Sequence, residues 1–189
     1  MISERERMLA GELYFPYDPE LVAARLRTRR RLQVYNATTP DEPERRRQLL
    51  SELLGRLDGK AEIEPPFFCD YGENITAGDN LYMNFNCVVL DCAAITIGAN
   101  VLIGPAVQIY AATHPTDPAT RRSGRELAFP VTIGDDVWIG GGAILCPGIC
   151  IGSGSTIAAG SVVSRDIPAG GIAAGNPCRT IRAVSATGK

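Results

Sequence analysis

The chain has 189 residues, with 19 Lys and Arg against 21 Asp and Glu, which gives a formal net charge of −2. Nucleic-acid-binding domains are usually basic, so this balance argues against a nucleic-acid partner. No stretch approaches the roughly 18 apolar residues needed to span a membrane. The N-terminal residues MISERERMLA lack the apolar core of a signal peptide. We therefore expect one compact, cytoplasmic domain without a membrane partner.

The first sixty residues carry helix signals, and they show no six-residue period. Ser3 and Glu6 have the spacing of a capping box, which predicts a short helix that ends near Gly11. Asp18 stands before a proline suited to the first helical position, which predicts a second helix running toward Tyr35.

A third helix is predicted from Thr39, which is followed by Glu42 three residues later and would cap a helix reaching about Gly55. We interpret residues 1–60 as a helical segment with one of two tasks. It either closes the open end of the structure that follows or covers a functional site.

Aliphatic residues recur at every sixth position in the rest of the chain. The strictest run, with a small residue after each member, is Ile133, Ile139, Leu145, Ile151, Ile157 and Val163. Earlier blocks with the same period are Ile97, Ile103 and Ile109, and more weakly Ala77, Met83 and Val89. A helix repeats about every 3.6 residues and a half-buried strand every two, so neither explains a period of six. The pattern predicts a parallel β-helix that turns a corner every six residues.

Two interruptions break this period. The step from Val89 to Ile97 is eight residues rather than six. Residues 111–130 carry polar, charged and turn residues, although the flanking anchors Ile109 and Ile133 are 24 residues apart, a multiple of six. We expect the coil to resume in register after an excursion loop at 111–130, and such insertions usually lie on a functional face. The β-helix domain would span 61–189, with a C-terminal tail at 168–189.

His114, the only histidine, stands at the start of the excursion loop. Pro115 stiffens the backbone after it and biases His114 toward extended conformations. Imidazole titrates nearest to neutral pH, so it can take a proton from a hydroxyl and return it. A lone histidine is more often an ordinary surface residue, but this position makes His114 a candidate general base.

Two further segments are candidate site elements. Asn84 lies in a polar stretch where the coil would place an aliphatic residue and a small one, and it is either a turn residue or a site residue. Arg179 and Arg182 stand three apart, beyond the expected last coil. Guanidinium groups suit phosphate oxygens, so this pair is a candidate phosphate ligand.

At these residues the chain resembles the maltose, galactoside and nodulation-protein-L O-acetyltransferases. These are hexapeptide-repeat enzymes that transfer acetyl from acetyl-CoA to a sugar hydroxyl. The resemblance covers nearly the whole chain, and its segments are Met8–Tyr14, Pro65–Gly72, Asn84–Cys87, Thr113–Pro115, Ser123–Glu126, Val137–Gly141 and Ala174–Pro177. The hexads alone mark only a superfamily. The His-Pro loop, the Asn-Phe-Asn segment and the N-terminal helices point to the sugar-acetylating branch.

The resemblance implies a mainly β fold: a left-handed parallel β-helix of hexapeptide repeats with an N-terminal α-helical segment and a protruding loop. It implies a homotrimer with sites between subunits, and acetyl-CoA as a co-substrate in the groove between neighbouring solenoids. No permanently bound cofactor and no metal are required. The acceptor would be a sugar or oligosaccharide of the maltose/glucose or chitooligosaccharide type.

By matching position, His114 is the general base, and Asn84 lies beside the acceptor and the developing charge. The resemblance also places Asp70 and Tyr82 near the sugar. The matching acetyl-CoA positions are Trp138, Gly141, Ala159, Ser164, Arg165, Arg179 and Arg182. Trp138 either packs against the coenzyme or lies in the core.

Three positions depart from the galactoside enzymes. The chain has Pro16 where they carry an acid, and nearby Asp18 either takes over that acceptor contact or only caps the helix. Cys92 replaces another acid. Glu126 replaces a methionine and matches the maltose-type enzymes, where it either orients His114 or is an ordinary loop charge. The changes at Cys92 and Glu126 argue against a galactoside-type pocket.

The histidine and cysteine content bears on other functions of a hexapeptide coil. A hexapeptide carbonic anhydrase needs about three zinc-binding histidines, which one histidine excludes. The six cysteines form no C-x-x-C pair and are interpreted as reduced, and none is paired with the histidine as a nucleophile would be. An acetyltransferase with a non-sugar acceptor and a non-catalytic solenoid used for assembly remain the alternatives.

Overall fold

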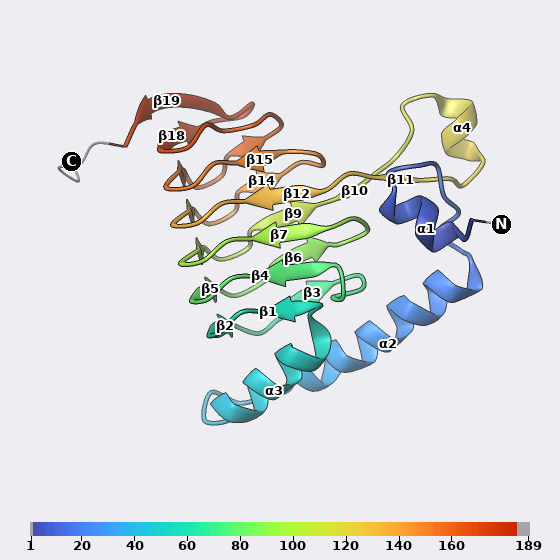
Figure 1. Cartoon of the computed structure of the whole chain (residues 1–189), viewed down its shortest axis with the longest axis horizontal. Coiled ribbons are helices and arrows are strands. Elements are labelled where there is room, and N and C mark those ends of the chain that lie inside the picture. Colours follow the sequence, from blue (N-terminus) through green and yellow to red (C-terminus); the bar gives the residue numbers. More distant parts are fainter. Residues whose placement is uncertain (1, 185–189) are drawn as a thin grey trace.

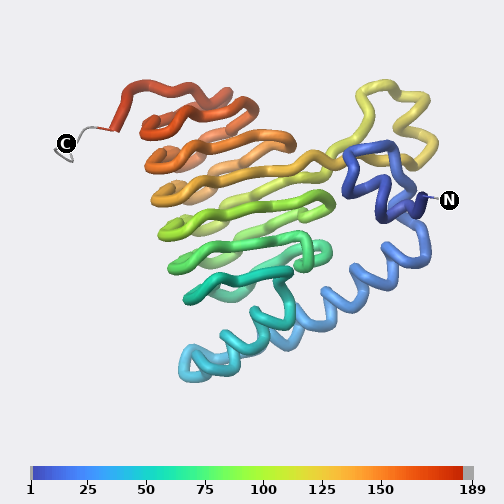
Figure 2. Tube along the Cα trace, in the orientation of Figure 1, coloured from blue at the N-terminus to red at the C-terminus, as the bar shows by residue number. Residues whose placement is uncertain are grey.

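Three parallel β-sheets are visited in rotation, one strand of each per turn, so that the turns stack into a three-sided coil (Figures 1 and 2). The structure, a computed structural model, describes residues 2–184. Residue 1 and residues 185–189, at the ends of the predicted helical segment and tail, lie outside the described residues.

We call the three sheets faces I, II and III. Face I contains β1 (Arg56–Leu57), β4 (Ile75–Ala77), β7 (Ile95–Ile97), β12 (Val131–Ile133) and β15 (Cys150–Ile151). Face II contains β2 (Ala61–Ile63), β5 (Leu81–Met83), β8 (Leu102–Ile103), β13 (Trp138–Ile139), β16 (Thr156–Ile157), β18 (Gly171–Ala174) and β19 (Arg179–Ala183). Face III contains β3 (Phe67–Cys69), β6 (Cys87–Leu90), β9 (Gln108–Tyr110), β14 (Ile144–Leu145) and β17 (Val162–Val163).

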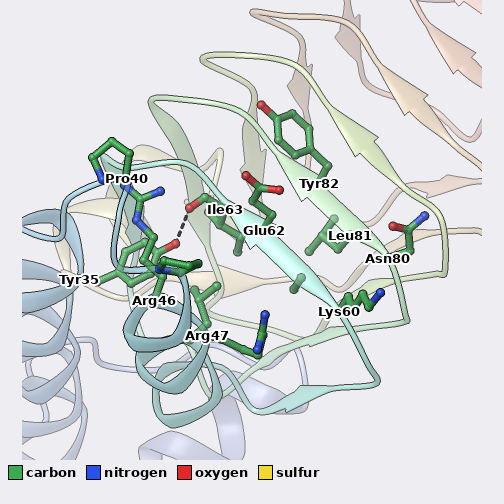
Figure 3. A pocket seen from close by; sticks show the side chains of 13 residues that line it. Tyr35, Pro40, Arg46, Arg47, Lys60, Glu62, Ile63, Asn80, Leu81 and Tyr82 are labelled. Carbon is green, nitrogen blue, oxygen red and sulfur yellow. Dashed lines mark hydrogen bonds between the residues drawn. The ribbon is translucent and has the colours of Figure 1, made fainter.

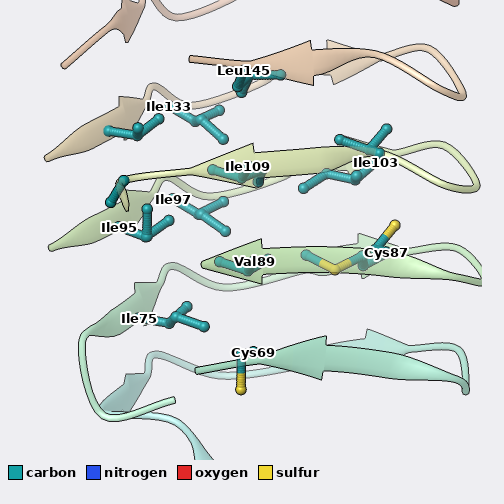
Figure 4. Packing of buried hydrophobic residues seen from close by; sticks show 14 of the residues in the cluster. Cys69, Ile75, Cys87, Val89, Ile95, Ile97, Ile103, Ile109, Ile133 and Leu145 are labelled. Atoms are coloured by element: carbon teal, nitrogen blue, oxygen red, sulfur yellow. The ribbon is translucent and has the colours of Figure 1, made fainter. Parts of the chain in front are cut away.

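The six-residue repeat is confirmed position by position. Ile133, Ile139 and Leu145 lie on faces I, II and III in turn, and each pairs in parallel register with the repeat residue of the next turn. All three are at most 1% exposed. The side chains of Ile133 and Leu145 point into the coil and stack with those of neighbouring turns (Figure 4), and Ile139 belongs to the same buried cluster. The core is therefore a set of aliphatic columns, as the period predicts.

The two irregular connections predicted from the sequence, and a third at 70–74 that was not predicted, meet at one corner of the coil, between faces III and I. Residues 91–94 take up the eight-residue step between β6 and β7, and residues 70–74 join β3 to β4 in the same way. The excursion loop 111–130 leaves the coil at this corner too, between β9 and β12 (Figure 1). We call this edge corner III–I.

The excursion loop has structure of its own. Its ends form an antiparallel pair, β10 (Ala112–Thr113) and β11 (Leu127–Ala128), and its tip contains the short helix α4 (Pro118–Arg122). After the loop, Val131 and Ile133 pair with Ile95 and Ile97. The prediction that the coil resumes in register is confirmed.

Two of the three predicted helix starts are confirmed. Helix α1 (Glu4–Leu9) begins with the capping box of Ser3 and Glu6. Helix α2 (Pro19–Asn36) begins after Asp18, whose carboxylate accepts the backbone N–H of Glu20 at 3.0 Å.

The predicted cap at Thr39 is wrong, because helix α3 (Pro43–Leu53) begins only after Glu42. The residue before a proline is biased away from helical conformation, so Pro43 fixes the start. Thr39 and Glu42 do interact, but outside the helix: the Glu42 carboxylate accepts the Thr39 backbone N–H at 2.9 Å.

The helical segment closes the first turn of the coil and also contacts the excursion loop. Helix α3 and the adjoining half of α2 lie across the first turn of the coil, and α1 lies beside the excursion loop (Figure 1). The Thr28 hydroxyl of α2 donates to the backbone oxygen of Tyr71 at 2.7 Å. Tyr14, between α1 and α2, bridges to Glu126 of the excursion loop. None of the helices in residues 2–184 is both long and apolar enough to cross a membrane.

The coil extends further than its repeat indicates. Strand β18 falls in the predicted tail, yet it stacks in parallel on β16. Its inward residue is Ala173, which is fully buried against Ile157 but lies outside the six-residue phase. Strand β19 then reverses direction and pairs with β18 in antiparallel register.

We predict that Ile133→Ala lowers the free energy of unfolding by about 2–5 kcal/mol, because it leaves a cavity in the aliphatic column. Ile133→Val should lose only about 0.5–1.5 kcal/mol. Thr132→Ala, on the exposed side of the same strand, is the matched control and should change stability by less than about 0.5 kcal/mol. Urea unfolding at one protein concentration measures all three. Equal losses at positions 132 and 133 would contradict the inward assignment.

Candidate functional site

A first group of predicted site residues gathers at corner III–I. A cavity of about 510 Å³ is lined there by Asp70, His114 and Glu126, together with residues of the N-terminal segment that include Tyr14 and Arg25. We call it the corner pocket. Asp70 follows β3, His114 follows β10, and Glu126 precedes β11. The irregular connections of the corner therefore bring together residues that lie far apart in sequence.

His114 is exposed in this pocket, whereas the proline after it is buried. Pro115 thus anchors the loop to the protein while the imidazole faces the cavity. The backbone oxygen of Pro115 also accepts a hydrogen bond from Arg121 of helix α4 at 3.1 Å. His114 therefore lies on a segment of the loop that is held by the burial of Pro115 and by the hydrogen bond to Arg121.

Glu126 is hydrogen-bonded to Tyr14 of the N-terminal segment. The Tyr14 hydroxyl donates to its Oε2 at 2.9 Å, and the two residues also exchange backbone hydrogen bonds of 3.1 and 3.0 Å. Tyr14 is fully buried, and burial raises the pKa of its phenol, so the hydroxyl keeps its proton and remains a donor. The carboxylate of Glu126 is therefore held at the wall of the corner pocket.

Asp70 is partly buried and hydrogen-bonded, unlike an isolated surface acid. Burial raises the pKa of Asp70, while the Cys92 thiol and the charge of Arg25 act to lower it. The Cys92 Sγ donates to Asp70 Oδ2 at 3.5 Å. Burial also raises the pKa of Cys92, so it is present as a thiol donor. This argues against Cys92 as a nucleophile, because the reactive form of cysteine is the thiolate.

The sequence reasoning missed the residue that supports Asp70. Asp91 is fully buried, and its carboxylate accepts the backbone N–H groups of Asp70 at 3.0 Å, Tyr71 at 2.8 Å and Asn74 at 3.3 Å. Burial raises its pKa to about 6. An acid placed at the break in the repeat after Val89 was the available signal. Asp91 joins two turns of the coil and fixes the segment that carries Asp70.

Arg25 is a second wall residue that the sequence reasoning did not single out. Its guanidinium donates to the Tyr71 hydroxyl at 2.6 Å and to the backbone oxygen of Pro16. It also lies over the Tyr71 ring, 5.7 Å from the centroid. These contacts tie α2 and the Pro16 segment to the coil beside the pocket. Asp18, by contrast, serves as the α2 cap.

A second group of predicted residues lies on face II. A cavity of about 570 Å³, which we call the face pocket, is lined by residues that include Tyr82, Asn84, Trp138, Gly141 and Ala159. Tyr82 and Trp138 both flank Leu102 in register across the sheet. Trp138 is 56% exposed, so it is a surface residue and not a core tryptophan.

Asn84 has a defined orientation in the face pocket. Its side-chain oxygen accepts the backbone N–H of Phe85 at 2.7 Å. The amide nitrogen is therefore the end left to donate to another group. The backbone N–H of Gly141, in the same pocket, makes no hydrogen bond within residues 2–184.

The remaining residues predicted to bind the coenzyme lie partly on face II and partly at corner III–I. Arg179 and Arg182 lie on β19 at the end of face II, where they pair with Ala174 and Ile172. Ser164 and Arg165 follow β17 and are exposed at corner III–I. Corner III–I is the one corner that face II does not touch. One chain therefore does not bring His114 together with Asn84, nor Arg165 together with Trp138.

Within residues 2–184, no three or more His, Cys, Asp or Glu side chains are grouped to hold a metal ion. All six cysteines are free.

Two family models match the chain. The "Maltose acetyltransferase hexapeptide capping motif" matches residues 7–59, and "Bacterial transferase hexapeptide (six repeats)" matches residues 130–165. Nodulation protein L of Rhizobium leguminosarum bv. viciae is 55% identical over 177 residues, which cover 94% of this chain and 93% of that protein.

Two solved structures are similar over nearly the whole chain. A maltose O-acetyltransferase from Clostridium difficile 630 has a TM-score of 0.96 and 45% identity, covering 97% of this chain and 98% of its own. A galactoside acetyltransferase in complex with coenzyme A has a TM-score of 0.94 and 40% identity, covering 98% and 92%.

The Tyr14–Glu126 contact gives a test of the corner pocket that does not depend on function. Tyr14→Phe should lower the free energy of unfolding by about 1.5–3 kcal/mol, because it removes a hydrogen bond to a charged group. In a Glu126→Ala background the same change should have a smaller effect, with a coupling of at least about 0.5 kcal/mol. Additive losses in the double-mutant cycle would show that the hydroxyl does not hold Glu126.

Proposed function

The chain belongs to the hexapeptide-repeat family of sugar acetyltransferases, and we propose that it moves the acetyl group of acetyl-CoA to a hydroxyl of a sugar or oligosaccharide, with His114 as general base. The observation that carries the role of His114 is its place in the corner pocket. The only histidine of the chain is exposed there beside two carboxylates, those of Asp70 and Glu126. Family membership favours this enzyme over the non-catalytic solenoid.

The proposed reaction is a direct transfer. The neutral imidazole of His114 takes the proton of a sugar hydroxyl as its oxygen attacks the thioester carbonyl. The tetrahedral intermediate collapses with cleavage of the carbon–sulfur bond, and the imidazolium returns the proton to the leaving thiolate of coenzyme A. A positioned base of this kind contributes roughly 10²–10⁴ in rate.

Asn84 and Gly141 are the proposed donors to the developing oxyanion. The orientation of Asn84 supports this role, because its oxygen is occupied by Phe85 and its amide nitrogen is left to donate. The Gly141 N–H adds a backbone donor in the same pocket. One donor of this type contributes about 10²–10³ in rate.

For the acceptor, we propose that Asp70, Glu126 and Tyr82 contact sugar hydroxyls. Carboxylates accept hydrogen bonds from hydroxyl groups, and Glu126 is already held in place by Tyr14. A held carboxylate loses little freedom on binding. Glu126 would also orient His114 through the second ring nitrogen. Cys92 and Glu126 favour an acceptor of the maltose/glucose or chitooligosaccharide type over a galactoside.

For the donor, we propose that acetyl-CoA lies along face II against Trp138, Gly141 and Ala159, with phosphate groups toward Arg179 and Arg182. The two arginines lie on β19, at the far end of the same sheet as Trp138. Ser164 and Arg165, at corner III–I, would contact the coenzyme from the neighbouring subunit. The related galactoside acetyltransferase has been solved with coenzyme A.

We propose a homotrimer in which corner III–I of one subunit faces face II of the next. This places His114 opposite Asn84 and forms three equivalent sites, which a single chain does not provide. Leu102 and Trp138 are 49% and 56% exposed on face II, so the same contact would cover an apolar row. Acetyl-CoA as substrate and six free cysteines fit a cytoplasmic location.

His114→Ala should reduce kcat by about 10²–10⁴ and leave the assembly intact, because the residue is exposed and contributes no aliphatic group to the core. Steady-state rates measure the loss of turnover, with Thr116→Ala on the same loop as control, and light scattering checks that the assembly is intact. Wild-type turnover in an assembled His114→Ala protein would remove His114 as the base.

Arg179→Ala and Arg182→Ala should each raise the KM for acetyl-CoA about tenfold or more while leaving the KM of the sugar unchanged, because a hydrogen bond to a charged group is worth about 1.5–3 kcal/mol. The comparison with dephospho-acetyl-CoA separates the phosphate groups. If removal of the 3′-phosphate raises the KM of the coenzyme by the same factor in the variants as in the wild type, the two arginines do not bind the 3′-phosphate.

A further inference from the structure

A third cavity, of about 310 Å³, lies where helix α3 meets the first strands of face II (Figure 3). We call it the helix pocket. Its polar lining residues are Arg46, Arg47, Lys60, Glu62, Asn80 and Tyr82. Only Tyr82 has a role in the function proposed above. The other polar residues surround a cavity to which the acetyl transfer assigns no ligand.

The helix pocket has a buried wall at Arg46 and an exposed rim at Arg47. Arg46 is held by the Glu64 carboxylate at 3.1 Å and by the Thr38 hydroxyl at 3.0 Å, and its side chain is only 14% exposed. Glu62 and Tyr82 are register partners on β2 and β5, so their side chains leave the sheet on the same side (Figure 3). Arg47, from the first turns of α3, is 58% exposed, and its ion-pair partner within residues 2–184 is Glu44 on its own helix.

The mixture of groups indicates the class of ligand. Arg47 and Lys60 donate hydrogen bonds, Glu62 accepts them, and the amide of Asn80 does both. A sugar hydroxyl also donates and accepts, and the ring of Tyr82 offers an apolar surface for the C–H face of a sugar. An anion would meet the Glu62 carboxylate, and an apolar ligand would desolvate the charged groups without replacing their hydrogen bonds.

The position of the pocket indicates which sugar it would hold. Tyr82 lines both the helix pocket and the face pocket. Along face II the order of strands runs from β2 and β5, at the helix pocket, through β13 with Trp138, to β19 with the two arginines. The half of face II beyond Tyr82, away from the proposed coenzyme path, is therefore open to the acceptor. A volume of about 310 Å³ is at the small end for ligand pockets and suits one ring.

We propose that the helix pocket is a second sugar subsite, which binds the residue of an oligosaccharide acceptor that adjoins the acetylated one. The inference rests on the proposed function, because it needs a sugar placed beside Tyr82 and Asn84. It adds a length preference: the enzyme acts on acceptors of two or more sugar rings more efficiently than on a monosaccharide.

The chain offers a matched pair of variants for the test. Arg47 and Arg45 lie on the same helix, are 58% and 55% exposed, and each pairs at 2.6 Å with the glutamate three residues earlier. Only Arg47 lines the pocket. Arg47→Ala therefore probes the subsite and Arg45→Ala controls for the loss of one surface charge. Glu62→Ala, on β2, probes the opposite wall.

The measurement is kcat/KM on two series of acceptors: glucose, maltose and maltotriose, and N-acetylglucosamine with its β-1,4-linked dimer and trimer. In the preferred series the wild type should favour the dimer and trimer over the monomer. Arg47→Ala and Glu62→Ala should each reduce that preference about tenfold. They should leave the monosaccharide rate and the KM of acetyl-CoA unchanged, and Arg45→Ala should match the wild type throughout.

The outcomes separate the two proposals. If monosaccharides are acetylated but chain length has no effect, or if Arg47→Ala and Arg45→Ala behave alike, the second subsite is wrong and the acetyl transfer stands. If Arg47→Ala lowers mono- and oligosaccharide rates equally, the residue acts on the reaction centre or the fold, and the subsite is again wrong. If no sugar of either series is acetylated, the proposed function fails and the subsite fails with it.

Discussion

The close stacking of successive turns is the constraint on which the rest of this structure depends. At Gly140 an added Cβ would lie 2.5 Å from the backbone nitrogen of Ala159 in the next turn, so the turns are in backbone contact at that corner. Each turn stacks in register on the one before. A side chain that points outward from face II therefore lies in line with its register partners on the same face. Tyr82, Leu102 and Trp138 therefore form one continuous row. The same rule keeps them away from corner III–I.

Corner III–I is where the coil departs from the hexad. The steps between inward residues exceed six at three places on this edge, across residues 70–74, 91–94 and 111–130. Buried Asp91 compensates for the irregularity by accepting backbone N–H groups from the neighbouring turn. The regular faces thus supply a flat surface suited to an extended coenzyme, and the irregular corner supplies the varied side chains that chemistry needs. The site proposed above combines residues of both, and this division is why it needs two copies of the chain.

The parts that could be predicted from the sequence are those in which burial or capping restricts the choice of residue. The inward columns follow a period of six because each flat side has one buried position, and Ser3 and Asp18 were found because caps need short polar side chains. Outward positions carry no such restriction, so the separation of His114 from Asn84 was visible only in three dimensions. The start of α3 was misplaced because Pro43 overrides Thr39. Arg47 and Glu62 form one pocket through the placement of α3, which no local pattern encodes.

The central claim, that each site combines His114 of one subunit with Asn84 of another, is tested by mixing two inactive variants. His114→Ala and Asn84→Ala homo-oligomers should each have little activity. Subunits unfolded and reassembled together in equal amounts should regain about one quarter of wild-type turnover, since about one quarter of the interfaces then combine an intact His114 with an intact Asn84. If each chain forms its own complete site, every site in the mixture keeps one defect. Activity no higher than that of the two parents in a verified mixed assembly would contradict the account.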